Sequence, residues 1–147
     1  MQAGSLTDFI SSSPAETFTI GQKIAKSLYP GSIIAITGTL GSGKTQLVKG
    51  ISSGLGITEN ITSPTYTIIN EYPLSLANNK YTLYHIDVYR LTGDKDFEDI
   101  GGLEILNSNG ICLIEWSERI LKSLPEDVIT VSIEITGDYS RLIRISN

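Results

Sequence analysis

Hydrophobic residues recur along this chain with two alternating spacings. Short runs rich in isoleucine, valine and threonine are typical of strands, and apolar residues three or four positions apart are typical of helices. The strand-like runs cover residues 5–10, 32–37, 66–72, 81–87, 110–115, 128–135 and 141–145. The helix-like stretches cover residues 13–28, 45–54, 94–100 and 117–124. Strands that alternate with helices predict one α/β domain over residues 1–147, built as a sheet with helices packed on it.

The lengths of the connections predict how the strands run. Residues 73–80 join two strands and are too few for a crossover helix, so this pair is expected to be antiparallel. Gly137-Asp138 is a turn signal between the last two strands, which predicts a hairpin. Strands joined through a helix are expected to be parallel. We therefore predict a three-layer sandwich whose mixed sheet is parallel in its centre and has antiparallel additions.

One glycine-rich stretch between a predicted strand and a predicted helix fits the phosphate-binding pattern G-x-x-x-x-G-K-[ST]. Glycines let the backbone come close to a ligand, and the N–H groups at the helix start form a cradle for phosphate oxygens. Lys44 can reach the β- and γ-phosphates, and the Thr45 hydroxyl can ligate Mg²⁺. The fold class is therefore predicted to be a single-domain P-loop NTPase. The predicted nucleotide-binding residues are Gly38, Thr39, Leu40, Gly41, Ser42, Gly43, Lys44 and Thr45.

Two of the predicted strands end in a carboxylate, Asp87 and Glu115. Ligands of open α/β sheets lie beyond the carboxyl ends of the parallel strands, where the P-loop also lies. Glu115 follows four apolar residues, so we predict that it holds the metal together with Thr45, directly or through water. Asp87 is predicted to be catalytic, by bonding a metal-bound water or by orienting the attacking one. The alternatives are a surface acid at position 115 and a turn-capping aspartate at position 87.

Thr65 lies in the loop between the P-loop helix and the next strand. GTPase-like switches place a threonine there that meets the γ-phosphate and the metal. We therefore predict Thr65 as a third catalytic residue beside Lys44 and Asp87. The alternative is an ordinary loop residue, because serine, threonine and proline are common in loops.

Other polar and aromatic residues near these motifs have less certain roles. His85 is the only histidine and shares a strand face with Asp87, and we expect it to be structural or to make a hydrogen bond. Arg90 and Arg119 can approach phosphate or form surface salt bridges. Trp116 follows the second acid, so core packing is the default role, although its position would let it report on nucleotide.

Composition limits the possible partners. The chain has 147 residues, 40% hydrophobic and 18% charged, with a net charge of −5. A domain that grips nucleic acid needs a basic face, so we expect no DNA contact and no direct grip on RNA. Cys112 is the only cysteine, lies in an apolar run and is expected to be a buried core thiol. With no signal-peptide pattern and no long apolar run, we expect a cytoplasmic protein without membrane contact.

Several blocks of the chain together resemble the TsaE (YjeE) family of small bacterial P-loop ATPases, which support threonylcarbamoylation of tRNA adenosine 37. The resemblance implies ATP and Mg²⁺ as cofactors, slow intrinsic hydrolysis, and action on a complex of the TsaD transferase with TsaB, so that tRNA is met only through that complex. It also implies that Lys44 and Thr45 are P-loop ligands, that Glu115 helps to hold the metal and that Asp87 is needed for activity. Two positions depart from the family pattern, Thr39 where Asp is frequent and Ser117 where Pro is frequent. The matching blocks are residues 38–45, 62–67, 70–72, 84–91, 98–101 and 114–119.

Three other functions are compatible with a P-loop. A small-molecule kinase is the main alternative, but such enzymes usually close a basic lid on the phosphates, and this chain has only four arginines. A GTPase switch would use an Asn-Lys-x-Asp loop, and the nearest match, residues 79–82, lacks the aspartate. A non-catalytic adaptor would dock on partners without turning over nucleotide.

Overall fold

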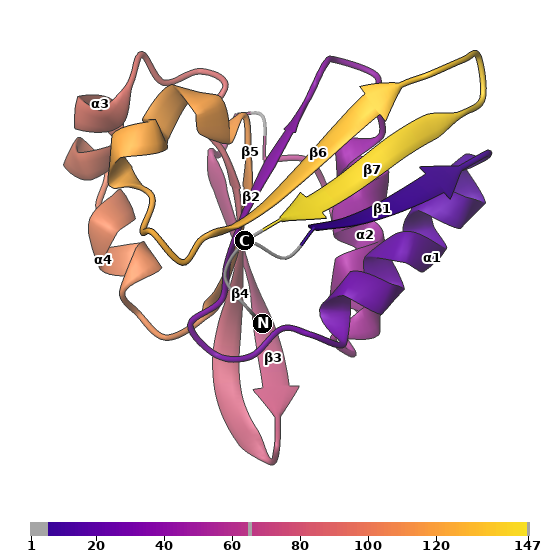
Figure 1. Ribbon diagram of the computed structural model, residues 1–147. Coiled ribbons are helices and arrows are strands. Elements are labelled where there is room, and N and C mark those ends of the chain that lie inside the picture. The colour runs from indigo at the N-terminus through magenta and orange to yellow at the C-terminus, as the bar shows by residue number, and fades with distance from the viewer. Residues whose placement is uncertain (1–5, 65, 147) are drawn as a thin grey trace.

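The chain forms one mixed sheet with helices on both faces (Figure 1). The computed structural model describes residues 6–64 and 66–146. Seven strands are hydrogen-bonded in the order β1-β7-β6-β2-β5-β4-β3. β6, β2, β5 and β4 are mutually parallel, whereas the β1–β7, β7–β6 and β4–β3 pairs are antiparallel. The strands are β1 (Leu6–Ser11), β2 (Ile33–Gly38), β3 (Ile69–Leu76), β4 (Asn79–Asp87), β5 (Ile111–Glu115), β6 (Ile129–Ile135) and β7 (Arg141–Ser146).

The helices make the two outer layers, which confirms the predicted three-layer sandwich. Figure 1 shows α1 and α2 on one side of the sheet and α3, α4 and the 3₁₀ segment that follows β5 on the other. Among the described residues, no helix has both the length and the apolar character needed to cross a bilayer. The helical elements are α1 (Pro14–Ala25), α2 (Lys44–Gly54), α3 (Asp94–Asp99), α4 (Gly102–Leu106) and the 3₁₀ segment η1 (Ser117–Ser123).

Side chains that alternate along the central strands pack in two hydrophobic clusters, one on each face of the sheet. On β2, Ile34 and Ile36 pack in the cluster beneath α1 and α2, whereas Ile33 packs in the cluster on the opposite face. On β5, Leu113 and Ile114 divide in the same way, and both are fully buried. A continuous apolar run is therefore what a parallel strand covered on both faces requires.

Two connections between elements differ from the sequence prediction. Residues 73–80 were expected to form a connection, but β3 continues through Pro73 and a tight turn follows at Ala77 and Asn78, both with positive φ. Pro73 is tolerated because β3 lies at the edge of the sheet, where one side of the strand has no ladder partner. The glycine pair that ends α3 also begins α4, a helix of five residues whose short sequence carries too little periodicity to predict it.

Candidate functional site

The glycine-rich loop joins the end of β2 to the start of α2. Its glycines adopt backbone angles that other residues rarely take, with φ of +157° at Gly38, +81° at Gly41 and +108° at Gly43. Space is also limiting, because a Cβ on Gly38 would lie 2.7 Å from the Ser42 hydroxyl and 2.9 Å from the Ile133 carbonyl oxygen. The loop therefore depends on glycine both for its conformation and for close packing against β6.

The loop encloses an open concavity of about 310 Å³, which we call the loop pocket. It collects seven of the eight predicted loop residues together with both predicted strand-end acids. Gly38 is absent from its lining because it lies behind the loop, against β6. The lining residues are Thr39, Leu40, Gly41, Ser42, Gly43, Lys44, Thr45, Ser63, Asp87 and Glu115.

The two acids are neighbours across the β4–β5 pair, where Asp87 is in register with Glu115. Glu115 is only 3% exposed, so it is not the surface acid that the sequence left open. Asp87 is 6% exposed, and its Oδ1 accepts a hydrogen bond from the Tyr89 N–H at 2.9 Å. Asp87 therefore caps a turn with one oxygen and also lines the loop pocket.

Burial shifts the pKa values of two residues of this site, Asp87 and Lys44. It raises the pKa of Asp87, and the negative charge of Glu115 raises it further, while the Tyr89 N–H, His85 and Lys44 oppose the shift. Burial also lowers the pKa of Lys44, against the attraction of Glu115, Glu118 and Asp87. Within this buried site, the positive charge of Lys44 and the negative charges of the acids therefore stabilise one another.

The Lys44 ammonium is turned back onto its own loop. It donates hydrogen bonds to the carbonyl oxygens of Gly38 and Thr39, the latter at 3.3 Å. It also lies 4.1 Å from the centre of the Trp116 ring. Trp116 has a left-handed backbone, with φ of +60°, which is rare for an aromatic residue and presents its ring to the lysine. Trp116 is half-buried, so it is not simply a core residue.

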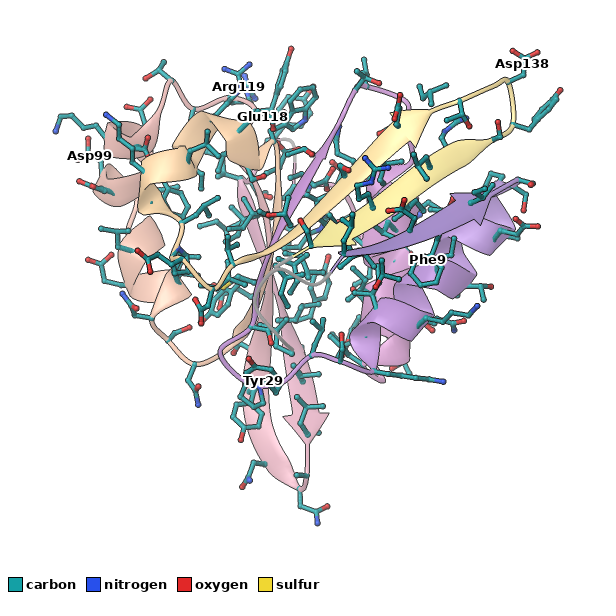
Figure 2. All side chains as sticks on the ribbon, viewed as in Figure 1. Phe9, Tyr29, Asp99, Glu118, Arg119 and Asp138 are labelled. Carbon is teal, nitrogen blue, oxygen red and sulfur yellow. The ribbon has the colours of Figure 1, made fainter. Side chains whose placement is uncertain are left out.

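Aromatic and arginine side chains pair beside the loop pocket. The Tyr89 ring packs on Trp116 with centroids 4.9 Å apart, and the Arg119 guanidinium lies over Tyr89 at 5.1 Å. Arg90 lies over Tyr66 at the same distance. In the described part of the chain, neither arginine belongs to an ion pair. Figure 2 shows Arg119 near the end of the molecule at which the P-loop lies.

His85 makes the hydrogen bond that the sequence led us to expect. It is fully buried on β4, and its Nε2 lies 2.5 Å from Oε2 of Glu115. Thr65, the third predicted catalytic residue, lies outside the described residues. Ser63, two positions earlier in the chain, lines the loop pocket.

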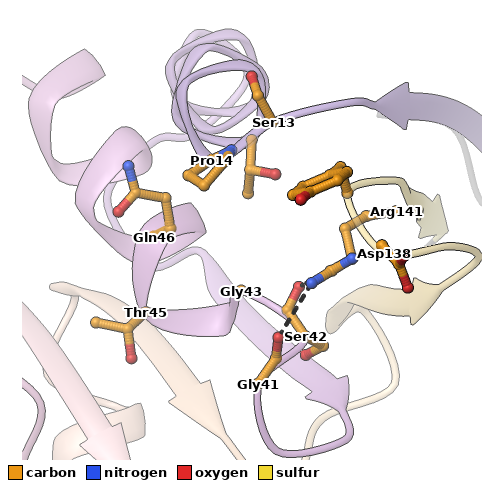
Figure 3. A pocket seen from close by; sticks show the side chains of 11 residues that line it. Ser13, Pro14, Gly41, Ser42, Gly43, Thr45, Gln46, Asp138 and Arg141 are labelled. Carbon is orange, nitrogen blue, oxygen red and sulfur yellow. Dashed lines mark hydrogen bonds between the residues drawn. The ribbon is translucent and has the colours of Figure 1, made fainter.

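A second open pocket, of about 400 Å³, lies on the other side of the loop (Figure 3). We call it the hairpin pocket, because one wall is the turn between β6 and β7. Sequence analysis missed both this pocket and its arginine. The lining residues are Ser13, Pro14, Thr17, Gly41, Ser42, Gly43, Thr45, Gln46, Asp138, Tyr139 and Arg141.

Arg141 ties that hairpin to the P-loop. Its Nε donates to the Ser42 carbonyl at 2.9 Å and one Nη donates to the Gly41 carbonyl at 3.4 Å (Figure 3). The other Nη donates to the carbonyls of Ser140 and Gly137, at 2.9 and 3.2 Å. All four acceptors are main-chain carbonyls, so the guanidinium fixes the outer side of the loop.

The fold and this site define a P-loop protein of the α/β class, with a lysine, a threonine hydroxyl and two buried acids around one pocket. The family model for "Threonylcarbamoyl adenosine biosynthesis protein TsaE" matches residues 11–143. The chain belongs to the TsaE family.

Individual relatives agree with this assignment. The chain is 42% identical to the tRNA threonylcarbamoyladenosine biosynthesis protein TsaE of Treponema pallidum, over 93% of this chain and 98% of that protein. It is 40% identical to the TsaE protein of Bacillus subtilis, over 88% of this chain and 78% of the relative. The crystal structure of Bacillus subtilis YdiB superposes with a TM-score of 0.78 at 32% identity, over 99% of this chain and 87% of that one.

Proposed function

We propose that this protein binds ATP with Mg²⁺ in the loop pocket and hydrolyses it in support of tRNA N6-threonylcarbamoyladenosine formation. The observation that carries the proposal is the convergence of Lys44, Thr45, Asp87 and Glu115 on one pocket beneath a glycine loop. The tRNA product comes from the names of the relatives, each called a tRNA threonylcarbamoyladenosine biosynthesis protein.

The pocket fits a magnesium-bound triphosphate better than a metal held by protein alone. The described residues contain no group of three or more His, Cys, Asp or Glu side chains able to hold a metal ion. Mg²⁺ is usually bound by one or two carboxylates together with phosphates and water, and Thr45 and Glu115 supply that protein share. Bound there, the ion would offset the charge that develops on the phosphates.

The proposal gives separate roles to the polar groups of the loop pocket. The main-chain N–H groups of the loop and the start of α2 bind phosphate oxygens. Lys44 exchanges the carbonyls of Gly38 and Thr39 for the β- and γ-phosphates. Asp87 uses Oδ1 for the turn and would accept a proton from water at Oδ2, and its raised pKa suits a general base. Thr65 remains a prediction as a γ-phosphate contact.

The hairpin pocket is our proposed place for the nucleoside. It adjoins Gly43, Thr45 and Gln46, where α2 begins, whereas both acids lie in the loop pocket at the other side of the loop. Pro14 and the Tyr139 ring offer surfaces on which a base can stack. We propose adenine because the chain lacks the Asn-Lys-x-Asp sequence that bonds guanine.

The partners in this proposal are a TsaD-type transferase and a TsaB-type subunit. The net charge of −5 supports contact with tRNA only through that complex. The tRNA substrate is also the reason why we place the activity in the cytoplasm.

Three assays test the function in steps: phosphate release from ATP by the protein alone, with the two partner subunits, and with tRNA added. We expect slow release alone, faster release with the partners, and no release by Lys44→Ala in any mixture. Transfer of the γ-phosphate to a nucleoside or a small hydroxy acid would instead favour a kinase. Absence of phosphate release in the full complex would contradict hydrolysis and favour an adaptor.

A further inference from the structure

His85 is a buried imidazole, and among the described residues only one of its two nitrogens has a hydrogen-bond partner. It is 0% exposed on β4 and is in register with Leu113 of β5. It lies two residues before Asp87, which is in register with Glu115. Its Nε2 lies 2.5 Å from Oε2 of Glu115. Its Nδ1 is buried and has no hydrogen-bond partner among the described residues. The ring is thus held between an apolar interior and the carboxylate that we propose for the metal.

This arrangement decides where the proton of the imidazole is. Among the described residues, a proton on Nδ1 would be a buried donor without an acceptor, which is costly, so the neutral Nδ1–H tautomer is disfavoured. The Nδ1–H tautomer would in addition set the Nε2 lone pair against a carboxylate oxygen. The geometry therefore places a proton on Nε2, and this N–H donates a hydrogen bond to Glu115.

We infer that His85 is a positioning residue for the metal site: its Nε2–H fixes Oε2 of Glu115, so that Oε1 is presented to magnesium in the loop pocket. The inference rests on the proposed function, in which Glu115 helps to hold the ion. Metal ligands are commonly oriented by a hydrogen bond from a neighbouring group, and the loss of such a bond typically weakens metal affinity by about 10–100-fold. Without the imidazole N–H, the carboxylate of Glu115 would rotate or turn away.

Two substitutions, His85→Gln and His85→Asn, distinguish a role of His85 in orienting Glu115 from a role in filling space. The side-chain amide of glutamine can place an N–H near the position of Nε2, whereas that of asparagine reaches only the position of Nδ1. Both are polar, uncharged and smaller than imidazole, so both disturb the packing around position 85. Only His85→Gln retains a donor that can reach Glu115.

The experiment measures Mn²⁺ affinity by electron paramagnetic resonance, with the full chain saturated by a non-hydrolysable ATP analogue and Mn²⁺ replacing Mg²⁺. We expect His85→Asn to weaken Mn²⁺ binding by about 10–100-fold and His85→Gln to stay within about threefold of the parent protein. Binding of the analogue without metal should be unchanged in both variants. Equal Mn²⁺ affinities for the two variants would overturn the inference.

A Glu115→Gln variant and the spectrum of the parent protein complete the test. If Glu115→Gln leaves Mn²⁺ affinity unchanged, the metal role of Glu115 fails and the inference falls with it. If Glu115→Gln weakens binding while the two His85 variants do not differ, only the role of His85 fails. The chain has one histidine, so its ¹⁵N resonances need no assignment. A protonated Nε2 is expected, and an unprotonated Nε2 would overturn the inference without any variant.

Discussion

Asp87 and Glu115 stand directly beside each other at the ends of two adjacent parallel strands, and both face the pocket beneath the P-loop. Two buried carboxylates at this spacing repel each other when both are ionised. Lys44 and the Tyr89 N–H offset that repulsion only in part, because burial still raises the pKa of Asp87. Under the proposed function, a magnesium ion bound with the nucleotide would offset the remaining repulsion.

Asp87→Asn is expected to lower ATP hydrolysis without lowering the stability of the fold. Because the pKa of Asp87 is raised in the folded state, its ionised form destabilises the fold at pH values above that pKa, and this penalty disappears as the pH falls toward the unfolded value near 3.8. Asparagine removes the charge and keeps the oxygen that accepts from Tyr89. At pH 8 the variant should unfold at a temperature no lower than that of the parent protein, with any gain shrinking toward pH 4.

In the same Asp87→Asn variant, ATP hydrolysis should fall by at least about 100-fold, the usual contribution of a general base. ATP affinity, measured by calorimetry, should change little. Loss of stability at both pH values, or hydrolysis at the parental rate in the partner complex, would remove the role given to Asp87.

Lys44→Met should abolish tight ATP binding while retaining an apolar side chain of similar length. Hydrogen bonds from a charged donor contribute about 1.5–3 kcal/mol, so the dissociation constant should rise by about 10–100-fold or more. Lys49→Met, on the same helix but outside both pockets, is the matched control. Calorimetry gives both constants, and equal affinities for the two variants would show that Lys44 does not contact phosphate.

The fluorescence of Trp116, the only tryptophan, should report nucleotide binding. The Lys44 ammonium lies 4.1 Å from the ring centre, and binding of a triphosphate is expected to draw it away. Titration with ATP and Mg²⁺ should therefore give a saturable change in emission. Its midpoint should agree with the dissociation constant measured by calorimetry. Lys44→Met should show no such change at the same ATP concentrations. A flat titration of the parent protein at saturating ATP would mean that the lysine stays on the loop.

Arg141→Ala should weaken ATP binding by loosening the P-loop from outside. The guanidinium bonds the carbonyls of Gly41 and Ser42, and charged hydrogen bonds of this kind suggest a loss of about tenfold in affinity. The rate at saturating ATP should be nearly retained, because Arg141 lies outside the loop pocket. Steady-state kinetics over a range of ATP concentrations separates the two effects.

Arg144→Ala is the control for Arg141, three residues along the same strand. Its guanidinium pairs with the exposed Asp8, and exposed pairs contribute only about 0–1 kcal/mol. It should bind and hydrolyse ATP like the parent protein. Similar kinetic defects in the two variants would point to general damage to the β6–β7 hairpin and against a specific tether.

The residues of the site that sequence could predict are those fixed by local rules. The P-loop is one continuous segment, so its glycines, Lys44 and Thr45 follow from a motif. Asp87 and Glu115 lie far apart in the chain, but each ends a strand of the parallel centre, and the carboxyl ends of such strands meet at one edge.

The residues that sequence could not predict depend on packing between distant segments. Arg141 reaches Ser42 across 99 positions, and only because the β6–β7 hairpin lies beside the loop. The bond between His85 and Glu115 depends on the register of β4 against β5, which no local pattern encodes. β3 runs through Pro73 because it is an edge strand, a fact known only once the strand order is known.

The most direct test of the account is a crystal structure with a non-hydrolysable ATP analogue and Mg²⁺. We expect the β- and γ-phosphates inside the loop of residues 38–45, with the Lys44 ammonium moved onto them and the metal bound to the Thr45 hydroxyl. Glu115 should reach the metal directly or through one water, with Asp87 facing the γ-phosphate. An empty loop at saturating analogue, or a bound nucleotide with both acids turned away from it, would contradict the account.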